Sequence, residues 1–176
     1  MVTKNIIYSA LFATFLSSCG VFCDELPFDK KALTYKNKFI FDNQFRMDGI
    51  YLMERNYGGY AMRYFFQNGS YYAEGTSNEI GLECYQIKAK ARELPYAWGC
   101  YIIEDNILKV QTYDPTSLNY ATKYKLYERW AEIVNDTTIH FFKEIDSGGK
   151  ERGLDETFHF RYCENKPDST NILMRD

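Results

Sequence analysis

Six side chains in the second half of the chain have the chemistry of a small-molecule binding site. They are five aromatic residues and one arginine: Trp98, Tyr101, Tyr113, Tyr124, Trp130 and Arg129. Aromatic rings stack on an apolar ligand, a tyrosine hydroxyl fixes its orientation, and a guanidinium pairs with an anionic group. Arg63 and Arg161 are further candidates for such a pairing. We predict ligand binding by these rings, and the alternative is that they only fill the interior of a small barrel.

Catalytic and metal-binding patterns are weak in this chain. His140 and His159 lie on predicted strands, but their spacing matches no compact metal motif. Glu128, Glu132 and Asp114 are acids that a glycosidase pocket would need, yet alternate charges on a strand usually face solvent. The sequence has no glycine-rich phosphate loop, no HExxH motif and no serine nucleophile elbow. It therefore predicts no metal, no cofactor and no enzymatic activity.

The cysteines suggest a chain that leaves the cytoplasm. Cys19 follows an apolar leader, and the other four are Cys23, Cys84, Cys100 and Cys163. Four thiols in an exported protein allow two disulfides in three pairings. The absence of a CxxC motif disfavours a redox centre or a zinc ribbon. Cys84 with Cys163 is the favoured bridge, and Cys100 can equally be a buried core thiol.

Residues 1–18 are predicted to be an export signal. A positive start at Lys4 precedes an apolar run over residues 6–16, too short for the roughly 20 residues of a membrane-spanning helix. The next residues, Leu16-Ser17-Ser18-Cys19-Gly20, resemble the lipobox of bacterial lipoproteins. This resemblance implies cleavage before Cys19, lipid on its thiol, and anchoring to the outer membrane, on its periplasmic face or at the cell surface. An ordinary secretory signal is the alternative, and it too places the protein outside the cytoplasm.

The elements that must position the candidate residues are short strands joined by hairpins. We expect residues 19–47 to be anchor and tether, and residues 48–176 to be one β domain. Asn68-Gly69 between two aromatic runs is a strong hairpin signal, and turns are also expected at 105–106 and 135–136. The expected strands are 50–55, 61–67, 70–74, 98–104, 107–113, 120–134, 137–145 and 157–163. Without a βα alternation, the prediction is an all-β antiparallel meander in a small up-and-down barrel, closed or partly open, with a sandwich as the alternative.

A second resemblance covers roughly residues 48–170. Three segments carry it: Asp48-Gly49-Ile50-Tyr51, the hairpin at 65–71, and Trp98-Gly99-Cys100-Tyr101-Ile102. In this order they are similar to the strands of small lipocalin-like lipoproteins. The match rests on turn and packing residues, and Tyr51 stands where true lipocalins have the tryptophan of their glycine-x-tryptophan signature, which begins at Gly49 in this chain. The resemblance implies a lipocalin-like barrel.

Composition and charge narrow the classes of partner. The net charge of −3 at pH 7 argues against a broad phosphate-binding surface, so no nucleic acid is expected. The 16 tyrosines and 13 phenylalanines favour strands and suit either a core or a pocket. We therefore expect a lipid-anchored envelope protein whose barrel binds a small apolar or amphipathic ligand. The alternative is a structural lipoprotein whose packed barrel docks onto another envelope protein.

Overall fold

The computed structural model describes residues 30–36, 38, 44–76, 95–115, 124–164, 166 and 169. Within them the chain forms two short 3-10 helices and eight strands. In order these are η1 (Lys30–Ala32), β1 (Gly49–Glu54), β2 (Tyr60–Phe65), β3 (Ser70–Thr76), η2 (Pro95–Ala97), β4 (Trp98–Glu104), β5 (Ile107–Pro115), β6 (Tyr124–Asn135), β7 (Thr138–Asp146) and β8 (Glu151–Tyr162).

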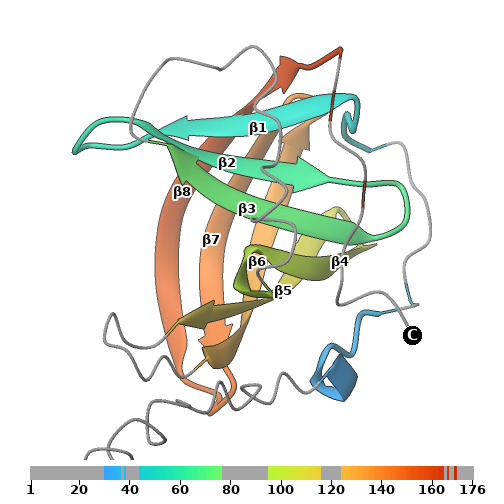
Figure 1. The fold of residues 1–176 in the computed structure, drawn as a ribbon, viewed down its shortest axis with the longest axis vertical. Coiled ribbons are helices and arrows are strands. Elements are labelled where there is room, and N and C mark those ends of the chain that lie inside the picture. Colours follow the sequence, from blue (N-terminus) through green and yellow to red (C-terminus); the bar gives the residue numbers. More distant parts are fainter. Residues whose placement is uncertain are drawn as a thin grey trace, which may run out of the picture.

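The eight strands follow one another around a closed antiparallel barrel, and β1 pairs with β8 to complete it. In Figure 1, β1, β2 and β3 cross in front of β6, β7 and β8. Closure gives every strand two neighbours, which removes the exposed edge that an open sheet would present. The prediction of an all-β meander barrel is confirmed in its closed form. All eight expected strands are present, although β8 begins at Glu151 and not at 157.

The two ends of the barrel are built differently. Tight turns after β2, β4 and β6 define what we call the turn end. There, Asp105 and Asn106 both have positive φ, 50° and 68°, as a type I′ hairpin turn requires. In the turn after β2, Gly69 has φ 78° and its N–H donates to the carbonyl of Phe66 at 3.0 Å. The opposite end, with the turns at 55–59 and 147–150, is called the mouth.

The strands alternate between an interior and an outer face. The interior cluster draws residues from all eight strands, together with Phe45 from the segment before β1. The outer cluster lies on the other face of β1 to β6 and includes Leu33. Both Phe45 and Leu33 are only 3% exposed, so two parts of the predicted tether pack against the barrel.

Two local features set which side chains face inward. Gly49 lies at the closing seam, where a Cβ would come within 2.1 Å of the Arg161 carbonyl oxygen. Only glycine fits this close approach of β1 to β8. In β7, the pairing with β8 shifts register between Phe141 and Lys143. This bulge changes the alternation, so that Glu144 and Phe141 both face the interior.

Candidate ligand-binding site

The structure divides the six predicted ligand-binding residues between the two faces of the barrel. Tyr101 belongs to the interior cluster, and Arg129 faces inward on β6 with Ala131 and Ile133. The other four lie on the outer face: Trp98, Tyr113, Tyr124 and Trp130. The structure therefore does not bring the six together in one site, and their binding of a ligand stays a prediction.

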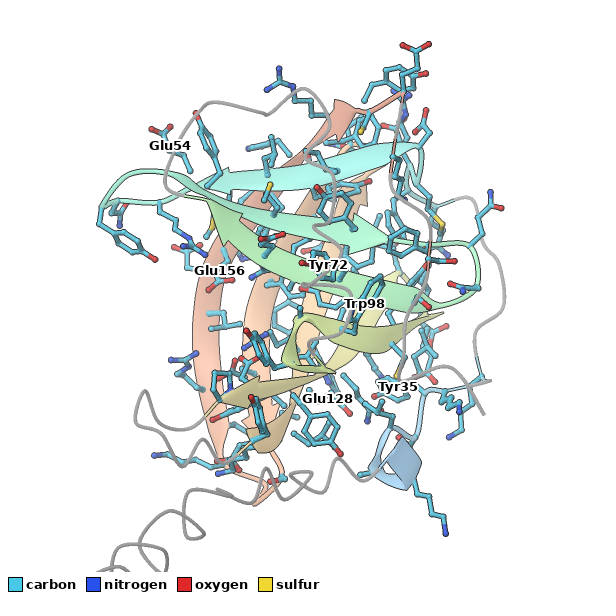
Figure 2. The ribbon with its side chains drawn as sticks, viewed as in Figure 1. Tyr35, Glu54, Tyr72, Trp98, Glu128 and Glu156 are labelled. Carbon is cyan, nitrogen blue, oxygen red and sulfur yellow. The ribbon has the colours of Figure 1, made fainter. Side chains whose placement is uncertain are left out.

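Most of the outward aromatic residues are packed against other rings. Trp98 is fully buried, and its ring centroid lies 4.8 Å from that of Tyr72. Figure 2 shows these two side chains together in front of β3 and β4. Tyr124 stacks on Tyr96 with centroids 5.7 Å apart and an interplanar angle of 12°. These contacts stabilise the outer cluster, so these rings pack on the outside of the barrel and do not fill its interior.

Trp130 contacts charged side chains of its own sheet. Lys109, Trp130 and Lys143 stand side by side on β5, β6 and β7. The two ammonium nitrogens lie 4.6 and 3.6 Å from the indole centroid, within the range of cation–π attraction. The indole Nε1 donates to Glu128 Oε1 at 2.6 Å. The protein thus supplies the partners of this ring itself.

Glu128 also joins the segment after η1 to the barrel. The side chain of Gln111 accepts from the backbone N–H of Tyr35 at 3.2 Å and donates to Glu128 at 3.3 Å. Burial, together with a hydrogen bond to Glu128, raises the pKa of the Tyr35 hydroxyl. Figure 2 shows Tyr35 and Glu128 near η1, below the outer cluster.

In the interior, the turn-end half is filled with aromatic rings. The Phe65 ring has its centroid 5.1 Å from Phe45, 5.7 Å from Tyr51 and 5.3 Å from Tyr101, in each case edge to face. The Tyr101 hydroxyl donates to the Phe66 carbonyl at 2.8 Å. The predicted pocket residue Tyr101 is therefore a packed core residue whose polar atom is satisfied within the protein.

The mouth half of the interior carries charges. Arg129 Nε donates to Glu144 Oε2 at 2.7 Å, and its Nη2 bonds to Asp114. Arg152 Nη2 lies 2.9 Å from the other Glu144 oxygen. Burial alone would lower the pKa of the Arg129 guanidinium, but the two carboxylates outweigh it and raise that pKa. Two arginines and two carboxylates thus balance one another, and we call these four residues the Arg129 network.

Arg63 and Tyr71 lie beside this network with unused hydrogen-bonding atoms. Arg63 Nη2 is 4.0 Å from Glu156 Oε2, and its guanidinium lies over the Phe158 ring at 4.8 Å. Among the described residues, the buried Arg63 Nε and Tyr71 hydroxyl have no hydrogen-bond partner. Burial raises the pKa of that hydroxyl, while Arg63 and Arg129 both act on it to lower it. The hydroxyl therefore lies close to both guanidinium groups.

Two hollows open at the mouth, and Arg55 and Arg63 line both of them. The first, the β8 hollow, has about 580 Å³ and polar walls: Glu54, Asn56, Asp155, Glu156 and Thr157. Figure 2 places Glu54 and Glu156 on this side of the barrel. The second, the β3 hollow, has about 430 Å³ and includes apolar walls: Ala73, Tyr96, Ala97 and Pro115. Both volumes fall in the range of small-molecule sites.

The β3 hollow exists because two neighbouring strands pair only briefly. β3 pairs with β4 over Ser70 to Tyr72, and β3 continues beyond this pairing to Thr76. The hollow lies beside this part of β3, which pairs with β2 but extends beyond its pairing with β4, next to η2 and the end of β5. Asp114 and Arg129 reach its inner wall, so the Arg129 network and the hollow are continuous.

The predicted catalytic and metal candidates do not converge. His140 and His159 lie on the outer face of β7 and β8, each facing a threonine of the neighbouring strand. Glu128 and Glu132 face outward on β6, whereas Asp114 faces the interior on β5. In the described part of the chain, no group of three or more His, Cys, Asp or Glu side chains is placed to hold a metal ion.

The cysteine predictions are tested only in part by the described residues. Cys100 is a free, buried thiol, and burial raises its pKa to about 12. Cys163 is disulfide-bonded. Cys19, Cys23 and Cys84 lie outside the described residues. The Cys84–Cys163 pairing and the lipidation of Cys19 therefore stay predictions.

A third hollow, of about 630 Å³, lies at the turn end and contains Lys166. The Lys166 ammonium donates to the backbone carbonyls of Met47 and Phe65. It also lies 4.5 Å from the centroid of Phe66. Burial lowers the pKa of Lys166 to about 8. These contacts fasten the chain after β8 across the turn end, so we assign Lys166 a structural role.

The sequence identified some of the mouth residues and missed others. Arg63 and Arg129 were correctly expected near the interior, but Arg161 is exposed on the outer face of β8. Tyr71 and Glu156 were not among the candidates. The Asn68-Gly69 turn could have identified Tyr71. A hairpin at this turn pairs Tyr71 directly with Phe65 and places the two side chains on the same face of the sheet.

Comparisons with protein-family models, with curated proteins and with solved structures find no match for this chain. Within the described residues, no helix has the length and apolar character that crossing a membrane would require. The candidate site therefore rests on the geometry of the mouth itself.

Proposed function

We propose that this protein is a lipid-anchored cell-envelope protein whose barrel binds a small amphipathic ligand at its mouth. The observation that carries the proposal is the pair of ligand-sized hollows at the mouth, both of which are lined by Arg63. Aromatic rings fill the turn-end half, so a ligand occupies only the mouth half. It must then match charged and polar groups as well as apolar walls.

The alternative, docking onto another envelope protein, has less support in the described residues. A docking barrel would present a continuous exposed apolar face. Three large apolar side chains are well exposed there, Tyr57 at 83%, Val134 at 53% and Tyr162 at 60%. They lie in the β1–β2 turn, on β6 and on β8, and so do not form one surface.

Binding is also favoured over catalysis. A general acid or base needs a carboxyl group that is free to exchange a proton with a substrate. The two carboxylates of the Arg129 network, Asp114 and Glu144, are instead engaged by Arg129. Both side chains therefore shape the site through their contacts with Arg129.

The membrane anchor is part of the proposal and rests on the lipobox-like residues before Cys19. Two or three acyl chains on that cysteine would hold the protein firmly to a bilayer. We expect Cys19→Ser to move the full chain from the membrane fraction to the soluble fraction of its host. Wild-type-like membrane retention of this variant would refute the anchor and leave the ligand site to be tested separately.

The ligand site is tested by titration with dansylundecanoic acid, an amphipathic fluorescent probe. We expect the wild-type protein to bind it saturably, and Ala73→Trp, which fills the β3 hollow, to lose that binding. Val134→Trp places the same ring on the exposed outer face and should bind like the wild type. No saturable binding by the wild type, or equal binding by Ala73→Trp, would overturn the proposal.

A further inference from the structure

Within the part of the chain that the structure describes, two buried atoms at the mouth, Arg63 Nε and the Tyr71 hydroxyl, lack a hydrogen-bond acceptor. Arg63 Nε can only donate, and the Tyr71 hydroxyl has no acceptor among the described residues. Tyr71 is 0% exposed, and the Arg63 side chain is 13% exposed. A buried donor without a partner is costly, and nearly all such groups in proteins are satisfied by protein, water or ligand. Arg63 lines both hollows, whereas Tyr71 lines neither, so an acceptor must enter at Arg63 to reach the Tyr71 hydroxyl beside it.

The charges around these donors favour a single negative charge. Arg129 is paired with Asp114 and Glu144, and Arg152 shares Glu144, so these cations are already neutralised. Arg63 is different, because its ion pair with Glu156 is long, at 4.0 Å, and Glu156 is one-third exposed. A monoanion can therefore replace Glu156 as the ion-pair partner of the Arg63 guanidinium, and the Glu156 side chain then turns toward water.

The walls of the two hollows decide where the rest of the ligand lies. The β8 hollow is lined by Glu54, Asp155 and Glu156, which would repel an anion and do not suit an apolar chain. The β3 hollow also has charged walls, Arg55, Glu74, Asp114 and Arg129, but it adds an apolar side made of Ala73, Ala97 and Pro115 beside Tyr96. Apolar groups are stabilised by leaving water for such walls. A ligand whose head lies at Arg63 therefore extends its chain into the β3 hollow.

Building on the proposed function, we propose that the ligand is an apolar chain bearing one carboxylate, held by Arg63 Nε and the Tyr71 hydroxyl with its chain in the β3 hollow. A carboxylate has two oxygens, one for each donor, and its hydrogen bond to a guanidinium is charge-assisted. Glu156 is the residue that the ligand carboxylate replaces beside Arg63.

The head group is tested with three probes of equal chain length on the full-length protein. Decanoate, decanol and decyltrimethylammonium are each titrated calorimetrically at pH 7. We expect decanoate to bind at least about tenfold more tightly than the other two, as loss of a charge-assisted hydrogen bond implies. Decanol or the ammonium compound binding as tightly as decanoate would overturn the carboxylate and leave the proposed function standing. Failure of all three, together with dansylundecanoic acid, would overturn both.

Variants test the residues with effects of opposite sign. Arg63→Gln should weaken decanoate binding about tenfold or more, and the exposed Arg161→Gln should leave it unchanged. Glu156→Gln should tighten it about threefold, because a competing and repelling charge of modest exposure is removed. A weaker or unchanged affinity in Glu156→Gln would contradict the placement beside Arg63.

Tyr71→Phe separates a binding role from a structural one. Without ligand, this variant should be as stable as the wild type or more so, because an unsatisfied buried hydroxyl is removed. Its affinity for decanoate should fall about fivefold, while its binding of decanol stays as it was. Unchanged decanoate affinity in Tyr71→Phe would overturn the proposal even if Arg63→Gln failed to fold.

Discussion

The two halves of the barrel interior differ in chemistry: packed aromatic rings fill one half, and charged side chains line the other. At the turn end, Phe45, Tyr51, Phe65 and Tyr101 interlock edge to face, and the polar atom of Tyr101 is satisfied by a backbone carbonyl. At the mouth, charged residues form a network, while Arg63 and Tyr71 keep unused donors. The difference teaches that stability is concentrated at one end and unsatisfied chemistry at the other. Such unsatisfied groups are typical of functional sites.

The energetic contrast follows from what each half buries. Aromatic pairs add roughly 0.5–1.5 kcal/mol each beyond the burial of their surface. A buried ion pair, by comparison, gives little net stability, because desolvation offsets its attraction. Yet removal of one partner is harmful, because the other charge stays buried alone. The ion pairs of the mouth therefore add little to the free energy of unfolding, and the residues there can be selected for ligand binding.

The largest expected effect is at the turn end. Phe65→Ala should lower the free energy of unfolding by about 3–5 kcal/mol, because it empties the centre of the ring cluster. Urea unfolding measures this loss. Val134→Ala, at an exposed position, should change it by less than about 0.5 kcal/mol. A loss below about 1 kcal/mol for Phe65→Ala would show that the turn end is not the stable half.

Removal of the central cation of the mouth should come next. Arg129→Met leaves Asp114 and Glu144 without their shared partner and should cost about 3 kcal/mol at pH 7. Arg152 still contacts Glu144, but the two carboxylates have lost their central cation, so protonation at lower pH relieves the burial of charge and the loss should shrink toward pH 4. Urea unfolding at both pH values checks this. A loss that is equal at pH 7 and pH 4 would contradict a charge-based role.

Lys166 offers a pH-dependent test of the turn end. Its pKa is about 8 in the fold and about 10.4 in the unfolded chain, so the unfolded state binds more protons between these values. The free energy of unfolding should therefore rise with pH across this window, by about 3 kcal/mol. Lys166→Met should lack this rise, and the difference between the two proteins isolates the lysine. Parallel pH profiles would contradict the burial of its ammonium group.

The smallest effect is expected at the rim of the mouth. The Arg152 side chain is 66% exposed and contacts Glu144 from the solvent side. Arg152→Gln should lower the free energy of unfolding by less than about 1 kcal/mol, and high salt should reduce the loss further. Thermal unfolding at low and high salt measures it. A loss as large as that of Arg129→Met would erase the distinction between the inner and outer parts of the network.

Strand order and most strand bounds could be predicted because their signals are local. Asn68-Gly69 and Asp105-Asn106 favour the left-handed backbone that short hairpins need, and the runs beside them have β propensity. The start of β8 was missed, because Glu151 to Asp155 carries no apolar alternation that would distinguish a strand from a loop. Those residues become a strand only because β7 lies beside them.

The candidate site depended on orientation, which local patterns left open. On β6, both faces carry a ring and a charge. Trp130 shares one face with Glu128, and Arg129 shares the other face with Tyr127. Either face could have been the interior, and the pairing of β6 with β5 and β7 turned Arg129 inward and Trp130 outward. A bulge in β7 then brought Glu144 to Arg129.

By itself, the sequence determined an all-β meander, because hairpin turns and β propensity act between residues that are close along the chain. The closure of β1 on β8, the filling of the turn end and the meeting of Arg63 with Tyr71 were decided by the tertiary structure. These features join residues far apart in sequence. A shift of one residue in a strand's register would exchange its inner and outer faces, and only the packing of the whole barrel selects one of them.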